Sequence, residues 1–382
     1  MNNHRVAKPE PQPSSGVRNE NTPATPLIWV LRSTGTGADR QLFNLAGALG
    51  GRVRVIDTLD GPLRALVERL TGAERRPIPP AKRHLFKPPW PDLVLFSGGR
   101  SLVDALRIRR ASGGHSRVVC IGRTGSALDR VDLVLTTPQY GLPEHSNVVH
   151  LDLPLNFVDQ AALDAGRRAW RDQFRAYPRP WHGVLLGGPS GSYRFASSAA
   201  KKLGDALQRL IARNGGSLLI TTSPRSPPDA IEAMLSRLET DHLVYRWRAD
   251  ADDNENPLHG ILALADDFVV TSDSASMLAE ACWIGRPVAV FEPPLRWRAK
   301  LLERLEPRHS ATTRTSRRAY WTVQGRWIPA RRMERIHRQL ASRGLITPIE
   351  KLAPDASPAL GGAGDHDLER VVAAVRRLLE RR

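Results

Sequence analysis

Small hydroxyl side chains gather at the start of one predicted helix, within residues 267–294. This stretch, DFVVTSDSASMLAEACWIGRPVAVFEPP, has the pattern of a strand, a tight turn, a helix and a second strand. Ser272, Ser274 and Ser276 would lie beside the unpaired N–H groups at the positive end of the helix dipole. A phosphate group binds well at such a place, so the motif indicates a phosphate-binding helix start.

Two other side chains in the same stretch bear on its chemistry. Glu280 follows the serines by about two helical turns, within reach of the hydroxyl groups of a sugar. Asp273 and Ser274 are also residue types that cap helices, so a purely structural interpretation of the motif stays open. The phosphate-binding interpretation requires other loops to meet at the same place.

Glycine-bearing loops follow predicted strands in both halves of the chain. Parallel sheets place their ligands at the carboxyl ends of the strands, so these loops are candidates for one shared site. Each alone is explained by a tight turn, since the sequence has neither a G-x-G-x-x-G motif nor a Walker lysine. The first half contributes Gly35, Gly37 and Gln41, then Gly98, Gly99 and Arg100. The second half contributes Gly187, Gly188, Ser190, Ser192 and Arg194, then Ser223 and Arg225.

The elements around these loops predict an α/β protein with two Rossmann-like, doubly wound domains. Apolar strands alternate with helical segments, and the pattern restarts at His182 after a helix and a Pro-Arg-Pro sequence. We expect a disordered tail over 1–26, a first domain over 27–157, a linker helix over 158–180, a second domain over 181–352 with a basic insert at about 295–330, and a loop with a final helix over 353–382.

Composition indicates a globular, strongly basic protein. The chain has 382 residues, of which 41% are hydrophobic, and 56 Lys and Arg against 39 Asp and Glu give it a net charge of +17. Such a charge favours an anionic partner, which can be a nucleotide-sugar, an anionic lipid surface or nucleic acid. Nucleic acid is the least favoured of the three, because the sequence has no recognisable nucleic-acid-binding motif.

The sequence also predicts a cytoplasmic protein. No apolar run approaches the roughly 18 residues of a membrane span, and residues 1–26 lack the apolar core of a signal peptide. Cys120 and Cys282 lie in or beside apolar segments, which indicates buried thiols in a reducing compartment rather than a disulfide or a metal site.

Much of the positive charge lies between residues 295 and 345. Thirteen Arg and one Lys against three Glu leave a net charge of about +11 in this segment. Tyr320, Trp321 and Trp327 lie among the arginines, so the segment can contact an anionic membrane and hold the protein at the inner face of the cell membrane. The alternatives are a small hairpin packed on the domain and an ordinary solvated surface.

The chain resembles the mitochondrial-fission "elongated mitochondria" family, whose bacterial members are GT-B-type glycosyltransferase-like proteins. Five stretches between residues 27 and 294 carry the resemblance: GTGADRQLFNLAGALG, PDLVLFSGGRSLVDALRIRRASGG, LLGGPSGSYRF, LLITTSPRSPPDAI and VVTSDSASMLAEACWIGRPVAVF. The first departs from the family pattern, because it reads ADRQ where an ending richer in amides is expected. The resemblance implies a nucleotide-sugar site and a final helix that crosses back onto the first domain, consistent with the apolar stripe Leu368, Val371, Val372, Val375, Leu378 and Leu379.

The resemblance also implies roles for the loops. The second-domain loops and the Ser272 to Ser276 helix start would hold the donor diphosphate, with Glu280 on the ribose and the first-domain loops facing the acceptor. Transfer would need no metal or other cofactor, because the helix dipole and arginines would absorb the charge of the leaving group. Asp250 and Asp252 have the spacing of a metal-binding pair but lie in the acidic loop DADDNENP, and we expect no metal there.

Two functions of different kinds fit this sequence. The first is a glycosyltransferase that moves a sugar from a nucleotide-sugar to a cell-envelope saccharide or lipid-linked acceptor. Asp39, the ionisable carboxylate of the first glycine loop, is then the candidate general base, although an Asp beside a helix start is also a common cap. The second is a non-catalytic GT-B-like scaffold that recruits a partner through the basic segment.

Overall fold

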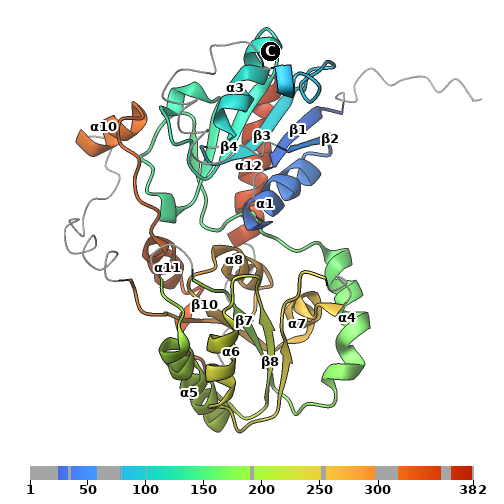
Figure 1. Ribbon diagram of the computed structural model, residues 1–382, viewed down its shortest axis with the longest axis vertical. Helices are drawn as coiled ribbons and strands as arrows, with labels where there is room; N and C mark the ends of the chain where they lie inside the picture. Colours follow the sequence, from blue (N-terminus) through green and yellow to red (C-terminus); the bar gives the residue numbers. More distant parts are fainter. Residues whose placement is uncertain are drawn as a thin grey trace, which may run out of the picture.

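Two parallel six-stranded sheets form the framework of the described part of the chain. The computed structural model describes residues 25–32, 36–57, 78, 80–99, 101–189, 193–250, 255–296, 317–353 and 363–380. One sheet lies in each half of the molecule (Figure 1). In the sequence, α4 (Gln160–Phe174) comes between the two sheets, and in space it lies beside the second one. The expected α/β class with two Rossmann-like domains is therefore confirmed.

The first sheet has the strand order β2-β1-β3-β4-β5-β6. Its strands are β1 (Leu27–Arg32), β2 (Arg52–Asp57), β3 (Leu93–Ser97), β4 (Arg117–Ile121), β5 (Leu133–Thr136) and β6 (Val148–His150). Its helices are α1 (Thr36–Ala48), η2 (Pro80–Lys82), α3 (Leu102–Ala111), η3 (Leu128–Arg130) and η4 (Pro138–Tyr140). The central strands are apolar throughout because helices cover both faces: α3 packs on one, and α1 on the other.

The second sheet has the order β12-β11-β10-β7-β8-β9. Its strands are β7 (Trp181–Leu186), β8 (Ser217–Thr222), β9 (His242–Tyr245), β10 (Asp267–Thr271), β11 (Val288–Phe291) and β12 (Thr347–Pro348). The helices of this half are α5 (Ser197–Asn214), α6 (Pro228–Leu235), α7 (Leu258–Leu264), α8 (Ala275–Trp283), α10 (Arg317–Val323), α11 (Met333–Ser342) and η6 (Ile349–Lys351). α5 and α6 cover one face, while α4, α7, α8 and α11 cover the other.

The last helix, α12 (Ala363–Glu380), leaves the second half and packs on the first (Figure 1). Val371 and Val375 are fully buried there in the core that α1 and β1 form. At its start, the buried carboxylate of Asp367 accepts a hydrogen bond of 2.6 Å from the backbone N–H of Asp152. The crossover expected from the apolar stripe and from the resemblance is thus present.

α10 and α11 also contact the first half, although β11 and β12 enclose them in the chain. The backbone N–H of Arg332 donates to the carbonyl of Gln139 at 2.8 Å, and Val323 packs on the first-domain core. Residues 317–323 form a helix, so the hairpin alternative for this segment was wrong. Residues 297–316, which hold much of the expected basic insert, lie outside the described residues.

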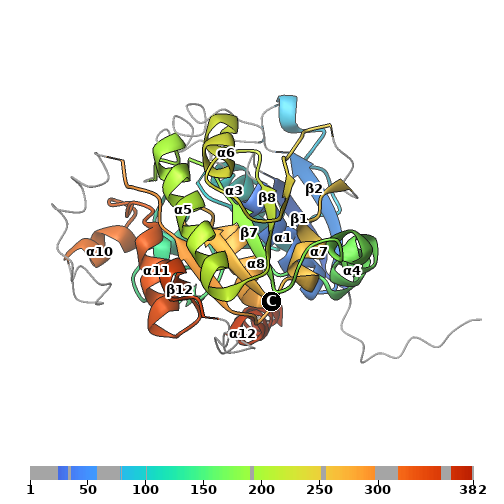
Figure 2. The same cartoon turned by 90° about the horizontal axis from the view of Figure 1, so that it is seen from below.

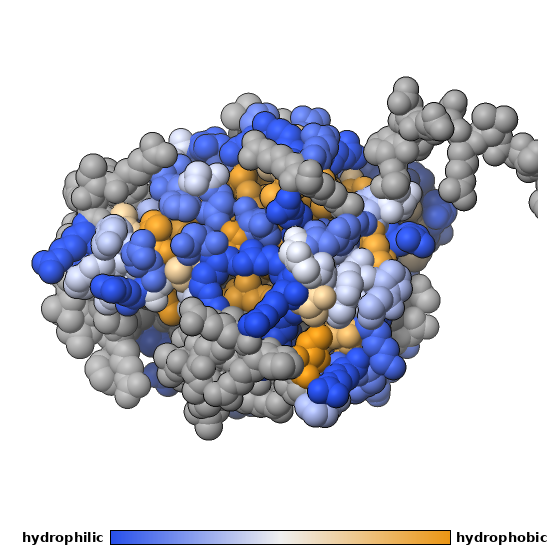
Figure 3. Space-filling view, turned by 90° about the horizontal axis from the view of Figure 1, so that it is seen from above, coloured by the Kyte–Doolittle hydropathy of each residue, from blue (hydrophilic) through white to orange (hydrophobic). Residues whose placement is uncertain are grey.

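The face of the molecule that Figure 3 shows is mainly polar. Seen from the end that the first domain forms, the described surface is mainly hydrophilic, with apolar residues in small separate patches (Figure 3). Among the residues that the structure describes, every helix is too short or too polar to cross a lipid bilayer. Cys120 and Cys282 are both buried free thiols, as the sequence predicted, and burial raises the pKa of each to about 12.

The crossover of α12 predicts that its buried face stabilises the first domain. Val375→Ala should lower the free energy of unfolding by about 2 kcal/mol, because it removes two buried methyl groups and leaves a cavity. Arg376→Ala changes an exposed residue of the same helix and should cost less than about 0.5 kcal/mol. Urea denaturation followed by circular dichroism measures both, and equal stabilities would contradict the packing of α12 described above.

Candidate functional site

The start of α8 lies at the edge of the second sheet that faces the first domain. β10 ends at Thr271, and Ser274 is the N-cap residue of α8 (Figure 1). The side chain of Ser274 makes no capping hydrogen bond with any described residue. The side chain of Ser274 therefore does not cap the helix, and its hydroxyl group can hydrogen-bond to a ligand.

Asp273 ties the helix start to the glycine loop after β7. Its Oδ2 accepts a 2.7 Å hydrogen bond from the N–H of Gly188, and Thr271 Oγ1 accepts one of 2.8 Å from the N–H of Gly187. A Cβ atom on Gly187 would lie 2.2 Å from Asp273 Oδ2, so only glycine allows this approach. Burial raises the pKa of Asp273, which favours its neutral form.

The turn after β8 meets the same loop. The Oγ of Ser226 donates to the carbonyl of Leu186 at 3.0 Å and lies 3.1 Å from the Oγ of Ser223. A Cβ on Gly188 would come within 2.0 Å of the carbonyl oxygen of Arg225. The half-exposed guanidinium of Arg225 reaches to 4.0 Å from Asp273 Oδ2. Three of the loops that the sequence singled out therefore meet at one edge of the second sheet.

Several buried polar atoms at this edge have no hydrogen-bond partner among the described residues. Buried polar groups are nearly always hydrogen-bonded, so such atoms indicate room for water or a ligand. They are Ser272 Oγ, Asp273 Oδ1, Tyr193 Oη and both ring nitrogens of His337, and of these Ser272 and Tyr193 lie beside each other. His337 Nδ1 lies 3.6 Å from a carboxylate oxygen of Glu292, and the attraction of His337 lowers the pKa of Glu292.

Glu280 is engaged by the other domain. Its side chain is only 2% exposed and forms an ion pair with Arg40 of α1, whose own side chain is 48% exposed. Burial raises the pKa of Glu280, and the charge of Arg40 acts in the opposite direction. The carboxylate expected to accept ribose hydroxyls thus binds a guanidinium from the first domain in this structure.

The first turn of α1 lies against the first turn of α8. A Cβ on Gly37 would lie 2.4 Å from Ser276 Oγ. The carbonyl of Gly37 accepts hydrogen bonds from Asn156 at 3.1 Å and Gln41 at 3.3 Å, which fix this end of α1. The carboxyl edges of the two sheets therefore face each other, with the first-domain loop placed opposite the second-domain loops.

The remaining predicted residues are placed as follows. Asp39 is buried in the first turn of α1, and Gly98, with a φ of 70°, and Gly99 form the turn after β3. Arg194 is exposed, and its N–H donates to the carbonyl of Pro294. Gly35, Arg100, Ser190 and Ser192 lie outside the described residues.

Sequence reasoning missed Arg40, Ser226 and His337. Arg40 lies in the sequence ADRQ, where this chain departs from the family pattern, and that departure could have drawn attention to it. Ser226 is the second serine of SPRSPP, and its repetition in the loop could have done the same. His337 lies on the buried face of an amphipathic helix, where nothing in its pattern marks it. Among the described residues, no three His, Cys, Asp or Glu side chains are grouped to hold a metal ion; Asp252 lies outside them.

Comparison with known proteins gives a family match and weaker structural likenesses. A family model described as "Mitochondrial fission ELM1" matches residues 36–377. The mitochondrial fission protein ELM1 of Arabidopsis thaliana is 28% identical over 339 residues, which cover 81% of this chain and 75% of that protein.

Two solved structures follow a similar overall course. S. aureus MnaA, in a structure with UDP, is 14% identical with a TM-score of 0.46, covering 93% of this chain and 97% of that one. A glycosyltransferase from Rickettsia africae is 9% identical with a TM-score of 0.45, covering 94% and 98%.

The ion pair between Arg40 and Glu280 predicts an asymmetric response to mutation. Arg40→Gln leaves a buried carboxylate without its partner and should cost about 3 kcal/mol at pH 7. Glu280→Gln leaves Arg40 half exposed to water and should cost less than about 1 kcal/mol. Urea denaturation of both variants tests this, and equal costs at pH 7 would contradict it.

The same pair predicts a pH dependence. The pKa of Glu280 is raised in the folded protein above its ordinary value of 4.5. Below pH 4.5 the carboxyl is neutral in both the folded and the unfolded chain, so its burial costs no free energy of ionisation. As pH rises through the folded-state pKa, ionisation of the buried carboxyl lowers the stability of the protein. Denaturation curves should therefore show that the stability cost of Glu280→Gln relative to wild type is smaller at pH 7 than at pH 4. The cost of Arg40→Gln should fade at pH 4, because Glu280 is then protonated.

Proposed function

This chain belongs to the mitochondrial fission ELM1 family, and on that premise we propose that it binds a nucleotide-sugar between the facing edges of its two sheets. We propose further that it transfers the sugar, without a metal ion, to a cell-envelope saccharide or lipid-linked acceptor. The observation that carries the proposal is the pair of buried, unpartnered oxygens at the start of α8, Ser272 Oγ and Asp273 Oδ1, among the described residues.

The start of α8 suits the diphosphate of the donor. The N–H groups and the positive dipole end of this helix attract negative charge, and Ser272, Ser274 and Ser276 add hydroxyl donors. An ionised Asp273 would repel a phosphate, but burial raises its pKa. The hydrogen bond from the Gly188 N–H and the charge of Arg225 act in the opposite direction. Our proposal therefore requires the phosphate charge to raise the pKa of Asp273 further; Oδ1 of the protonated carboxyl would then donate to a phosphate oxygen.

The neighbouring loops complete the donor side of the proposal. Gly187 and Gly188 bring the backbone close to the helix start, and Ser190 and Ser192 continue the same loop in the sequence. Arg225, with Ser223 in its turn, supplies a guanidinium group at this edge, and the exposed Arg194 would add a second one. As the bond to the sugar breaks, charge builds up on the leaving diphosphate, and these fixed positive groups would stabilise it.

Glu280 would bind the ribose after an exchange of partners. The carboxylate is paired with Arg40, so ribose hydroxyls must take the place of the guanidinium. Arg40 is half exposed and can turn to water, where it keeps its charge solvated. On the acceptor side, the loops with Gly35, Gly37, Gln41 and 98–100 face the cleft in this proposal, and Asp39 is the candidate base.

A second candidate function has its own support. The Arg40–Glu280 pair and the close approach of Gly37 to Ser276 fill the ribose end of the site with the protein's own side chains. A protein that kept the fold as a scaffold, without binding a donor, would be stabilised by such contacts. The two functions differ in whether Glu280 affects ligand affinity or only stability.

A measurement of nucleotide-sugar binding distinguishes the glycosyltransferase from the scaffold. Isothermal titration calorimetry with UDP-, GDP-, ADP- and dTDP-sugars should find one that binds wild-type protein. Glu280→Gln should weaken that binding by about 1 to 3 kcal/mol, as the loss of charge-assisted hydrogen bonds to the ribose predicts. Glu239→Gln, an exposed change in the turn before β9, is the matched control and should leave affinity unchanged.

The opposite pattern would favour the scaffold. If no nucleotide-sugar binds, or if Glu280→Gln lowers the melting temperature while affinity stays the same, Glu280 is a structural residue. Release of the sugar to water or to a supplied acceptor, followed by chromatography, then tests transfer itself on the donor that binds.

We also propose that α10 attaches the protein to an anionic membrane at the inner face of the cell membrane. α10 stands out from the body of the molecule (Figure 1). Tyr320, Trp321 and Trp327 are 60%, 37% and 41% exposed, and the guanidinium of Arg317 lies 5.0 Å from the ring centre of Trp321. Exposed aromatic rings beside arginines suit the interface between water and acidic lipid headgroups.

Sedimentation with vesicles tests this attachment. The protein should pellet with phosphatidylglycerol vesicles, less so at higher salt, and remain in solution with phosphatidylcholine vesicles. The double change Tyr320→Ala and Trp321→Ala should reduce pelleting severalfold, while Trp247→Ala, at a residue 39% exposed beyond β9, should not. Equal pelleting with both lipids would rule the attachment out.

A further inference from the structure

A strongly cationic pocket opens on the domain that contains β7, away from the candidate donor site. It has a volume of about 590 Å³, and five arginines with a single carboxylate line it: Arg167, Arg171, Arg175, Arg179, Arg286 and Asp266. Trp181 at its base begins β7, whereas Gly187 follows the other end of that strand, about 20 Å away. The pocket is therefore distinct from the candidate donor site.

One wall of the pocket is a stripe of arginines on α4. Arg167, Arg171 and Arg175 are four residues apart, so they lie on one face of the helix, where like charges repel. Arg167 and Arg175 each pair with an Asp three residues earlier, at 3.0 Å. Arg171 has Arg168 in that position and forms no ion pair with any described residue. The positive charge of Arg171, in the middle of the stripe, is thus not neutralised by a neighbouring carboxylate.

The opposite wall holds its arginines in place. Arg179 lies over the ring of Trp181 at 3.8 Å and donates to Asp266 at 2.8 Å. Arg286 donates to the carbonyls of Ala263 and Ala265. Asp266 also accepts from the N–H of Trp181 at 2.7 Å, so the one carboxylate of the pocket is already committed. Burial is the main cause that lowers the pKa of Arg286; the charge of Asp266 acts in the opposite direction, and those of Arg167 and Arg179 lower it further.

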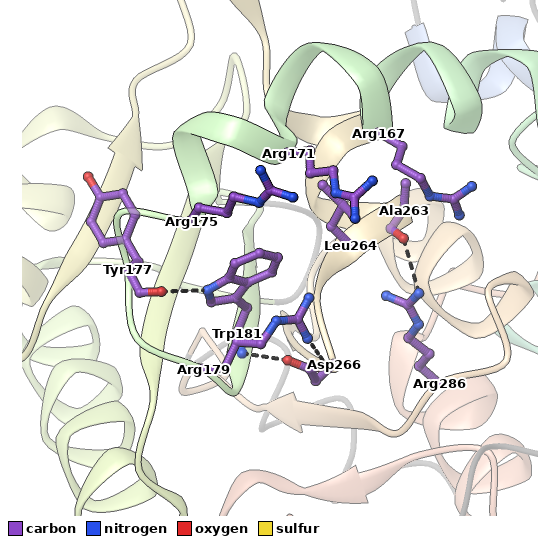
Figure 4. A pocket seen from close by; sticks show the side chains of 10 residues that line it. All are labelled: Arg167, Arg171, Arg175, Tyr177, Arg179, Trp181, Ala263, Leu264, Asp266 and Arg286. Atoms are coloured by element: carbon purple, nitrogen blue, oxygen red, sulfur yellow. Dashed lines mark hydrogen bonds and ion pairs between the residues drawn. The ribbon is translucent and has the colours of Figure 1, made fainter.

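The guanidinium groups converge from both walls. Those of α4 reach in from one side, and those of Arg179 and Arg286 from the other (Figure 4). The walls are firmly joined, because a Cβ on Gly166 of α4 would lie 2.5 Å from the backbone of His259, at α7. Figure 2 shows α4 and α7 on the side of the molecule opposite α10 and α11. The pocket is therefore preformed and separate from the aromatic surface of α10.

We infer that this pocket binds an anion with a multiply charged phosphate group, of which pyrophosphate is the simplest. Guanidinium groups match phosphate oxygens in bidentate pairs. Arg167, Arg175 and Arg179 each pair with an Asp. Arg171 and Arg286 form no ion pair with a described residue, so positive charge remains for such a ligand. The volume lies within the range of small-molecule sites. The phosphate can belong to a soluble molecule or to a lipid headgroup, since the recognising chemistry is the same.

Calorimetry with sodium pyrophosphate on the full-length protein tests the inference. Arg171→Gln should weaken binding at this site about tenfold. Arg168→Gln removes the same charge from the neighbouring, exposed position of α4 that does not line the pocket, and should change affinity less than about twofold. All measurements use the Arg225→Gln background, which weakens pyrophosphate binding at the candidate donor site.

A second arm identifies the source of the phosphate. If Arg171→Gln also pellets less than Arg168→Gln with phosphatidic acid vesicles, the pocket takes a lipid headgroup; if both pellet equally, it takes a soluble phosphate. The contribution of α10 is identical in the two variants. Equal pyrophosphate affinities of the two variants, with both folded by circular dichroism, would overturn the inference.

Discussion

The buried carboxylate of Glu280 is the constraint on which the arrangement of the two domains depends. A charge that is 2% exposed is costly unless an opposite charge meets it, and the second domain itself supplies none in the contacts described. Arg40 arrives from α1 of the first domain, and its position requires Gly37 to lie against Ser276. The orientation that satisfies Glu280 is also the one that sets two loop-bearing sheet edges face to face.

The sequence predicted what depends on local pattern and on the rules of parallel sheets. The strands, the helices and the meeting of Gly188, Arg225 and Asp273 at one edge all follow from strand and turn signals. Arg40 could not be matched to Glu280, because 240 residues separate them and only the packing of the domains joins them. Asp273 was a candidate for the donor site, with a helix cap as the alternative, and its carboxylate accepts a hydrogen bond from a neighbouring loop, which neither local pattern predicts.

In our two proposals, the two edges of the second sheet attract anions by different means. At the carboxyl edge, helix starts offer N–H groups and positive dipole ends, so few charged side chains are needed. At the amino edge, helices such as α4 end, and their last carbonyl groups and the negative end of the helix dipole repel an anion. An anion can be held there only by full charges, and Arg171 and Arg175 lie at this end of α4, where they also stabilise the helix.

The return of α12 to the first domain has a consequence for the order of synthesis. Val371 and Val375 complete a core whose other members, such as Ile28 and Leu42, leave the ribosome more than three hundred residues earlier. Domains usually fold as they emerge, but this one stays short of part of its interior until α12 has been synthesised. Until then, the apolar surface of the first domain that α12 covers stays exposed to water.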